Sequence, residues 1–349
     1  MAKVFGQQFT KQQLMKRVGN LGSIAGIKRL EYQSGRANGL RAYEVSNERL
    51  KFTINIDKGM DIASLFYDGM PMHFVSRPGE MNNNWYNDGP NSSRSITGGM
   101  MFTCGLSNVG PVQTLENGRT LPQHGYLRNA PAALDGARCY WDKDEYCMEV
   151  YGDIREASLF GENLVVRRTI TTKLGCSSVH IHDSIENEGC ASEPLMIMYH
   201  CNAGFPLLDK NSHLVIDPIS TTPRDEISER GMKSEDFRVF GEPVDEYDEQ
   251  VFYHRLKAVD GRCEATLVNP DRKLALNFSF DNRELPNLIQ WKCRASGDYV
   301  MGIEPSNCHP EGVQKEKQSG TIRMLSPGEI IETDIILTVI AGDMFDKKF

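Results

Sequence analysis

Glu304 lies in a stretch whose residue types suit acid–base chemistry. It follows the short apolar run Val300–Ile303 and precedes Pro305 and a polar turn that begins at Ser306. A residue before proline is pushed into extended conformations, so Glu304 cannot continue a helix. We expect its carboxylate at the end of a strand, where a rigid sheet can aim a catalytic group. The alternative is a solvated glutamate at a strand terminus.

His124 is the second residue that could carry chemistry. Gly125 follows it and has no Cβ, so the backbone there can pass close to a bound ligand. Arg128, four positions beyond His124, supplies fixed donors for hydroxyls, a carboxylate or a phosphate. The alternative is a turn histidine with an unrelated surface arginine.

His200 ends the apolar segment Met196–Tyr199, and Asn202 opens the loop that follows. Side chains alternate along a strand, so His200 faces away from both Tyr199 and Cys201. If those two neighbours face the core, His200 faces a cleft. If His200 itself faces the core, it is a hydrogen-bonded buried imidazole, which is the commoner case for a lone histidine.

Other polar segments point less sharply to chemistry. The glycines and polar side chains from Arg94 to Asn108 could line a small-molecule pocket, but they contain neither phosphate-loop pattern. His180 and His182 share a strand face and could make half of a metal site. No third ligand stands at a suitable spacing, so we expect a structural role for them and no bound metal. No Gly-x-Ser-x-Gly segment supports a hydrolase triad.

Many short strands must position these residues. Segments rich in Val, Ile, Thr and aromatic residues recur between Gly, Asn, Asp and Pro turns, and several alternate apolar with polar residues, as half-buried strands do. No strand alternates with a long amphipathic helix, which argues against a doubly wound α/β fold. We therefore predict an all-β protein built as a large antiparallel β-sandwich. The expected strands include 40–45, 50–56, 146–151, 164–172, 179–185, 195–199, 265–268, 274–280, 288–293 and 335–340.

Three regions depart from the strand pattern. A helix is expected over residues 8–20, capped by Thr10, within a helical or irregular lead-in of residues 1–38. Residues 76–125 are rich in Gly, Asn, Ser and Pro and nearly free of strand signals, which is typical of functional loops. Residues 222–250 are acidic, and we interpret them as a solvated insertion or rim loop, with disorder as the alternative. No linker separates two domains, so one domain of 349 residues is predicted.

Composition narrows the class of protein. A formal charge of -8 and a pI near 5.6 argue against nucleic-acid binding. The apolar runs fall short of the roughly 18–20 residues that span a bilayer. Residues 1–16 have no apolar segment typical of a secretory signal. Nine cysteines without CxxC pairs indicate reduced thiols, and hence a cytoplasmic protein. The sequence leaves the oligomeric state open, a homodimer being one option.

Five segments, in their order along a β-rich chain, carry a resemblance to a known family. They are Asp57–Ile62, Thr103–Leu106, His124–Gly125, Tyr199–Gly204 and Gly302–Pro305. Together they resemble the aldose 1-epimerase (galactose mutarotase-like) superfamily, and most closely its DUF4432 branch of proteins without known function. The resemblance covers most of the chain. It implies a large antiparallel supersandwich with a sugar cleft on one concave face.

The resemblance also implies roles for three residues. His124 would contact and orient a sugar, His200 would protonate the ring oxygen, and Glu304 would remove the proton of the anomeric hydroxyl. Ring opening needs one proton taken and one given, and the roles reverse when the ring closes on the other face. A carboxylate and an imidazole can do both when their pKa values are tuned toward neutrality. No metal or organic cofactor is expected.

Departures from the family pattern leave the substrate open. His124 and Gly125 are followed by Tyr126 where mutarotases have a second glycine, and with Arg128 this segment is more similar to that of hexose-6-phosphate epimerase-like relatives. Tyr199–Asn202 replaces an Asn-His-Ser-Tyr motif. The expected sugar-contacting residues are Arg128, Arg94 as a loose match to a pocket arginine, Asn202, Asn108, and Asp209 as a candidate for the family's sugar-binding aspartate.

The resemblance implies an isomerase that interconverts the anomers of a free or modified sugar. The expected partner is therefore a small-molecule carbohydrate, with no nucleic acid and no membrane. One alternative is a carbohydrate-binding or sensor protein without catalysis. A glycosidase or lyase is another, because a fold does not determine its function. A glycosidase would need a second carboxylate about 5 to 9.5 Å from Glu304.

Overall fold

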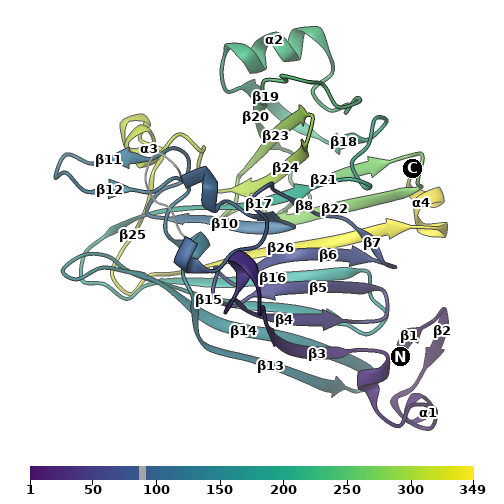
Figure 1. The fold of residues 1–349 in the computed structure, drawn as a ribbon. Helices are drawn as coiled ribbons and strands as arrows, with labels where there is room; N and C mark the ends of the chain where they lie inside the picture. Colours follow the sequence, from purple (N-terminus) through teal and green to yellow (C-terminus); the bar gives the residue numbers. More distant parts are fainter. Residues whose placement is uncertain (86–91) are drawn as a thin grey trace.

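Two large β-sheets lie face to face in the computed structural model, which describes residues 1–85 and 92–349 (Figure 1). Their ladders are antiparallel. In the described residues the larger sheet has 12 strands, in the neighbour order β19 (Pro218–Pro223), β20 (Gln250–Leu256), β23 (Asn287–Ala295), β24 (Asp298–Ser306), β17 (Glu193–Ala203), β10 (Met101–Leu106), β6 (Asp61–Tyr67), β5 (Leu50–Asn55), β4 (Arg41–Ser46) and β3 (Gly26–Glu31), with β25 (Arg323–Leu325) beside β17 and β7 (Met70–Pro71) beside β6.

The smaller sheet forms the second layer. Its described strands are, in order, β13 (Ala132–Asp142), β14 (Glu145–Ala157), β15 (Asn163–Lys173), β16 (Ser178–Asn187), β26 (Ile330–Ala341), β22 (Leu274–Asp281), β21 (Arg262–Asn269) and β18 (His213–Ile216). Three two-stranded ribbons pair β1 (Ala2–Val4) with β2 (Gln7–Phe9), β8 (Phe74–Val75) with β9 (Gly98–Gly99), and β11 (Gln113–Thr114) with β12 (Thr120–Leu121).

Helices are short and lie at the ends of the sandwich. The α-helices are α1 (Lys11–Met15), α2 (Glu226–Ser234), α3 (Val313–Ser319) and α4 (Asp343–Lys348), and the 3₁₀ turns are η1 (Leu21–Ser23), η2 (Gly35–Ala37), η3 (Asn83–Trp85), η4 (Ser92–Ser95) and η5 (Leu127–Asn129). In the described residues, no helix combines the length and the apolar character needed to cross a membrane.

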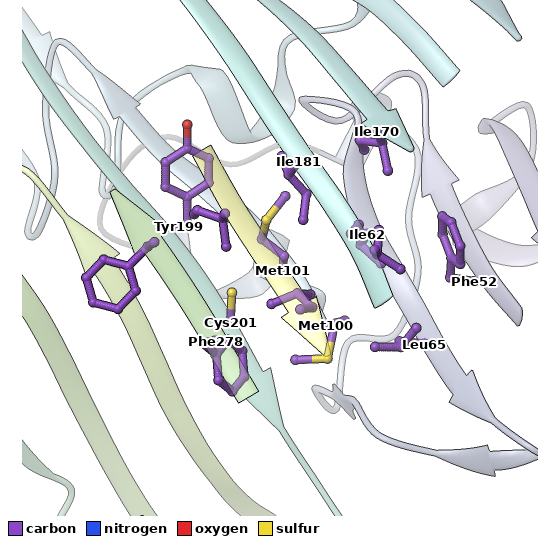
Figure 2. Packing of buried hydrophobic residues seen from close by; sticks show 14 of the residues in the cluster. Phe52, Ile62, Leu65, Met100, Met101, Ile170, Ile181, Tyr199, Cys201 and Phe278 are labelled. Atoms are coloured by element: carbon purple, nitrogen blue, oxygen red, sulfur yellow. The ribbon is translucent and has the colours of Figure 1, made fainter. Parts of the chain in front are cut away.

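The predicted antiparallel sandwich is confirmed, and each of the ten expected strands overlaps an observed one. The alternation in residues 178–187 appears as a strict alternation of buried and half-buried side chains along β16. Its buried side chains meet those of the larger sheet, and Figure 2 shows Ile181 of β16 in the same core as Tyr199 and Cys201 of β17. Each fully buried large apolar side chain contributes about 1.5–3 kcal/mol, so this layer supplies the main stabilising force.

The prediction for the N-terminal lead-in was partly wrong. Thr10 does cap a helix, since its hydroxyl accepts from the Gln13 N–H at 3.2 Å and the Gln13 side chain accepts from the Thr10 N–H at 2.9 Å. The helix, however, covers only Lys11–Met15, because the residues before Thr10 pair in a β-ribbon. The lead-in also contains β3, an edge strand of the larger sheet.

The interpretation of residues 76–125 as nearly strand-free was wrong at β10. This strand lies in the middle of the larger sheet between β6 and β17, and all six of its residues are buried. A strand covered on both faces shows no alternation, and Gly105 interrupts its apolar run, so the sequence pattern missed it. Residues 86–91 of the Asn-rich stretch lie outside the described residues.

The acidic segment 222–250 contains a helix where a loop was expected. Asp225 caps α2, and its carboxylate accepts from the Ser228 N–H at 2.8 Å. The helix stands beyond the ends of β19 and β20, away from the sandwich core (Figure 1). Its buried side is formed by the small residues Ser228 and Gly231, so the helix lacks the wide apolar stripe by which a helix is recognised in sequence.

Candidate active site

The register of the larger sheet brings His200 and Glu304 together. β10 and β17 pair Phe102 with His200, and β17 and β24 pair Cys201 with Ile303. The second register sets His200 opposite Glu304, at the separation where side chains on neighbouring strands touch. Nε2 of His200 lies 3.2 Å from Oε1 of Glu304. Two residues far apart in the chain therefore form one cross-strand pair.

His200 faces a pocket, because its neighbours Tyr199 and Cys201 both belong to the core between the sheets (Figure 2). The pocket has a volume of about 550 Å³ and lies on the outer face of the larger sheet. Its described lining residues are Phe74, Ser76, Ile96, Gly98, Phe102, Gly110, Pro111, Gln123, His124, Met198, His200, Asn202, Arg224, Glu249, Val251, Ile289, Trp291, Asp298, Glu304, Pro310 and Glu311.

Glu304 lies inside β24 and not at its end, which corrects the expected position. The strand continues through Pro305, which pairs with Leu288 of β23. Gly302, two positions earlier on the same face, makes room for the carboxylate: a Cβ added there would lie 2.2 Å from Oε1 of Glu304. The sequence shows that Pro305 follows Glu304 and that Gly302 precedes it by two positions. The space that Gly302 leaves for the carboxylate is visible only in the folded sheet.

His124 reaches the pocket from the loop between β12 and η5. Its backbone has φ of 59°, and its N–H donates to the Gly110 carbonyl at 2.8 Å. The Gly110 N–H in turn donates to Nδ1 of the imidazole at 3.3 Å. Because Nδ1 accepts, the proton of the neutral ring lies on Nε2. The His124 and His200 rings are nearly perpendicular, with centroids 5.9 Å apart.

Gly125→Ala is expected to destabilise the protein, because the His124 loop packs tightly against β10. Gly125 has φ of +75°, and an added Cβ would lie 2.1 Å from the Gly105 carbonyl oxygen. Gly118→Ala is the matched control, since Gly118 has φ of +82° and no atom within 4 Å of an added Cβ. Urea unfolding should place Gly125→Ala about 1–3 kcal/mol below Gly118→Ala, the usual cost of overpacking. Equal unfolding free energies would contradict the close packing of this loop.

Burial shifts the titration of all three groups toward their neutral forms. It raises the pKa of Glu304 well above its usual value, and the negative charge of Glu249 adds to this while Arg224 opposes it. Burial lowers the pKa of His200 to about 3 and that of His124 well below its usual value. In the free site, burial therefore favours two uncharged imidazoles and holds a proton on Glu304 more tightly than an exposed carboxyl would.

Three buried polar atoms at this site lack a hydrogen-bond partner in the described part of the chain. They are Nδ1 of His200, Oε1 of Glu304 and Oδ1 of Asn202. The approach of His200 to Glu304 is thus a contact and not a formed hydrogen bond. Buried polar groups are nearly always paired, so these three atoms remain available to a polar group placed in the pocket.

Aromatic rings form the apolar part of the pocket wall. Phe102 stacks on His200 with centroids 4.4 Å apart, and Trp291 meets the same imidazole nearly edge-on at 5.5 Å. The Trp291 indole N–H donates to Glu249 at 2.8 Å, and Arg224 donates to the other oxygen of Glu249 at 3.3 Å. Such faces suit the apolar side of a sugar ring, with polar groups beside them.

Sequence reasoning missed Arg224, Glu249 and Trp291 as pocket residues. Arg224 and Glu249 stand at the two ends of the acidic insertion, which was interpreted as a solvated loop. Trp291 lies in a predicted strand, and its alternation with the buried residues beside it was the available signal.

The structure does not bring Arg128 or Asn108 into the pocket. Arg128 is buried and donates to the carbonyls of Gln123 and Ser95, each at 3.2 Å. It lines a separate cavity of about 20 Å³, too small for a sugar. Asn108 is fully buried and holds loops together, for example through the Pro122 carbonyl at 3.0 Å. Polar side chains of buried loops are needed for such backbone contacts, and sequence does not separate this use from ligand binding.

Arg94 and Asp209 also lie apart from the lining residues. Arg94 is exposed in η4, and Asp209 is half-buried and accepts from the Lys210 N–H at 2.8 Å. Neither contributes to the pocket. Of Arg128, Arg94, Asn202, Asn108 and Asp209, Asn202 is the one among the described lining residues, together with His124, His200 and Glu304.

His180 and His182 contact carboxylates of β26 and lie outside the pocket. His180 contacts Asp334, and His182 lies 2.9 Å from Glu332. Over residues 1–85 and 92–349, no group of three or more His, Cys, Asp or Glu side chains is arranged to hold a metal ion.

Comparisons with known proteins place the fold. A protein from Klebsiella pneumoniae described as "a putative aldose 1-epimerase" is similar over 97% of this chain and 88% of its own, with a TM-score of 0.86 and 23% identity. A galactose mutarotase-like protein from Clostridium acetobutylicum covers 92% of this chain and all of its own, with a TM-score of 0.64 and 14% identity. Galactose 1-epimerase from Lactobacillus acidophilus covers 91% and 99%, with a TM-score of 0.57 and 12% identity.

At these identities the similarity shows the fold, which is that of the galactose mutarotase-like sandwich. No curated protein matches the sequence. The profile of the family described as "Domain of unknown function (DUF4432)" matches residues 37–339, which is most of the 349-residue chain. The chain therefore belongs to the DUF4432 family.

Proposed function

We propose that this protein is an aldose 1-epimerase-like enzyme that interconverts the anomers of a sugar by acid–base ring opening. The observation that carries the proposal is the approach of His200 Nε2 to Glu304 Oε1 at 3.2 Å on the wall of a pocket of about 550 Å³. The ring oxygen and the anomeric hydroxyl of a sugar are bonded to the same carbon. Two proton-transfer groups that lie side by side can therefore reach both oxygens at once.

One proton circulates between the pair and the sugar. Transfer of the Glu304 proton to His200 yields a carboxylate and an imidazolium, and hydroxyl groups of a bound sugar stabilise these charges. Glu304 then takes the proton of the anomeric hydroxyl while His200 protonates the ring oxygen, so the C1–O5 bond breaks and an open-chain aldehyde forms. Rotation about the C1–C2 bond and the reverse transfers close the ring as the other anomer.

His124 orients the sugar in this proposal. Its Nδ1 is engaged by the Gly110 N–H, so Nε2–H is left as a donor. Burial lowers its pKa well below the usual value, so it stays uncharged and donates without competing for the transferred proton.

All nine cysteines are unpaired, which favours a reducing compartment and supports a cytoplasmic site of action.

The test is anomer exchange measured by NMR saturation transfer and polarimetry on a panel of free aldoses. We expect faster exchange than in buffer for at least one sugar, together with loss of that rate in His200→Asn. Calorimetry on the same panel separates the alternatives. A sugar that binds without faster exchange would contradict the proposal and favour a carbohydrate-binding protein, and release of a sugar from a glycoside would favour a hydrolase.

A further inference from the structure

The charged groups around the pocket are mostly carboxylates. Besides Glu304, the described lining residues include Glu249, Asp298 and Glu311, and Arg224 is the one cation among them. Asp298 is paired outside the lining with Arg77 at 2.8 Å. Residues 86–91 contain no lysine or arginine in their sequence, so they add no cation.

The guanidinium of Arg224 is already engaged. It lies 3.3 Å from Glu249 through one terminal nitrogen and 2.8 Å from Asp225 through Nε. A phosphate or a carboxylate on a substrate would have to displace these partners. Arg128 belongs to a segment that is similar to that of hexose-6-phosphate epimerase-like relatives, but it lines a separate cavity outside the pocket. The described pocket thus presents no spare cation to an anionic sugar.

Glu249 is held in place and still reachable. One oxygen accepts from the Trp291 indole and the other from Arg224, while the side chain remains 49% exposed at the pocket. A carboxylate has about four lone-pair positions, so two remain for hydroxyl groups of a ligand. Trp291 contacts both Glu249 and His200, so Glu249 lies across the indole from the imidazole, near enough for its charge to help raise the pKa of Glu304.

The wall that carries Glu249 is anchored to the sheet. Arg224 follows β19 directly and Glu249 precedes β20, so the insertion begins and ends at the pocket. Within it, Glu235 binds Lys292 at 2.9 Å and Arg294 at 2.8 Å, both on β23. Figure 1 shows the insertion with α2 standing over these strands.

We propose that Glu249, clamped by Arg224 and Trp291, is a specificity-determining residue that selects uncharged sugars and excludes anionic ones such as sugar phosphates and uronic acids. The inference rests on the proposed function and names its substrate class. Glu249 accepts hydrogen bonds from sugar hydroxyls and repels a negative group brought to the same place. Like charges brought together at an interface disfavour the complex, so a negative group is disfavoured at this place in the pocket.

The experiment compares the wild type with Glu249→Gln on one accelerated aldose, its 6-phosphate and its uronic acid. The wild type should favour the neutral sugar in kcat/KM by about 100-fold or more. In Glu249→Gln, KM for the neutral sugar should rise about tenfold, because a hydrogen bond to a sugar hydroxyl is weakened. Glu249 also helps to raise the pKa of Glu304, so any change in kcat should be the same for neutral and anionic sugars. The anionic sugars should gain about tenfold, since the repulsion is removed and Arg224 loses a charged partner.

Two further variants make the result specific. Glu246→Gln removes the same charge from an exposed position of the same insertion and should leave the preference unchanged. Adding Arg224→Gln to Glu249→Gln should cancel the part of the anionic gain that the released guanidinium supplies. An unchanged neutral-to-anionic ratio in Glu249→Gln, or an equal shift in Glu246→Gln, would overturn the inference.

The inference and the proposed function fail in different ways. The ratio of dissociation constants for the neutral and anionic sugars, measured by calorimetry on Glu304→Gln with and without Glu249→Gln, needs no turnover. A wild type that binds neutral sugars selectively through Glu249 but accelerates none overturns the proposed function alone. A wild type that accelerates anionic sugars as well as neutral ones overturns this inference alone, and a protein that binds no sugar overturns both.

Discussion

Glu304→Gln is expected to lower the rate of anomer exchange by about 10²- to 10⁴-fold, the usual contribution of a positioned acid–base group. Glutamine has nearly the same size and still forms hydrogen bonds, but it neither takes up nor releases a proton at neutral pH. Sugar binding should persist, because the rest of the pocket is unchanged. Saturation-transfer NMR gives the rate and calorimetry the affinity.

Glu264→Gln is the matched control for this variant. Glu264 is exposed on β21, in the sheet that does not carry the pocket, and its substitution should leave the exchange rate unchanged. A Glu304→Gln variant with full exchange activity would remove Glu304 from the mechanism. The distance between His200 and Glu304 would then describe a structural contact only.

Stability against pH provides a readout of the same group without a substrate. The pKa of Glu304 lies well above its usual value of 4.5 in the folded protein because the carboxyl is buried. The folded state therefore holds this proton more tightly than the unfolded state, and its stabilising contribution is complete below about pH 4.5. That contribution is lost as the pH rises through the folded-state pKa. Relative to the wild type, Glu304→Gln should gain in unfolding free energy as the pH rises from about 5 to 9, measured with urea, and a constant difference would contradict the raised pKa.

Arg168→Met is expected to lower the free energy of unfolding by about 3–5 kcal/mol, since it breaks a buried ion pair by removing one partner. Arg168 is fully buried and binds both oxygens of Asp183, at 2.8 and 2.6 Å, and Asp61 at 3.1 Å. These contacts join β15 and β16 of the smaller sheet to β6 of the larger sheet. Without the guanidinium, two buried carboxylates remain in the core with no cation to balance their charge.

Arg167→Met at the next position is the control for Arg168→Met. Arg167 pairs with Glu186 and Glu188, but its side chain is 40% exposed, and such surface pairs contribute about 0–1 kcal/mol. Urea unfolding of both variants at neutral pH should separate them clearly. Similar losses in the two variants would show that Arg168 stabilises the fold no more than a surface arginine.

The pH dependence of Arg168→Met has a defined sign. Burial raises the pKa of Asp61 to about 7 even with Arg168 beside it, so removal of Arg168 raises it further. A carboxyl with a raised folded-state pKa stabilises the protein most below its unfolded pKa and loses this contribution as the pH increases. The deficit of Arg168→Met should therefore be smallest near pH 4–5 and grow toward pH 8.

The hydrogen-bond network around Arg168 also includes residues next to the candidate site. The Tyr199 hydroxyl donates to Asp183 at 2.6 Å, and Thr103 donates to Asp61 at 2.7 Å. Tyr199 precedes His200, and Thr103 follows Phe102, which stacks on the His200 ring. These polar contacts between the sheets therefore hold β10 and β17 in position. The opposite face of the same two strands carries the pocket residues Phe102 and His200.

The sequence by itself determined the fold class and the main site candidates. Alternation in residues such as 179–185 and 274–280 predicted half-buried strands because the side chains of a strand point to opposite faces. The same rule placed His200 opposite to Tyr199 and Cys201. The residue types and local motifs marked His124, His200 and Glu304 as candidates, and the family resemblance implied their acid–base roles.

Only the tertiary structure decided which candidates meet. The sequence pattern missed β10 because both faces of this strand are buried. The pairing of β10 with β17 sets Phe102 opposite His200. Strand register pairs His200 with Glu304, and it depends on long-range packing that no local pattern encodes. Arg128 is buried among loops and does not line the pocket. Glu249 lines the pocket because the insertion that contains it folds back on the sheet. Residue types therefore limited the chemistry, and the pairing of distant strands selected the residues that can perform it.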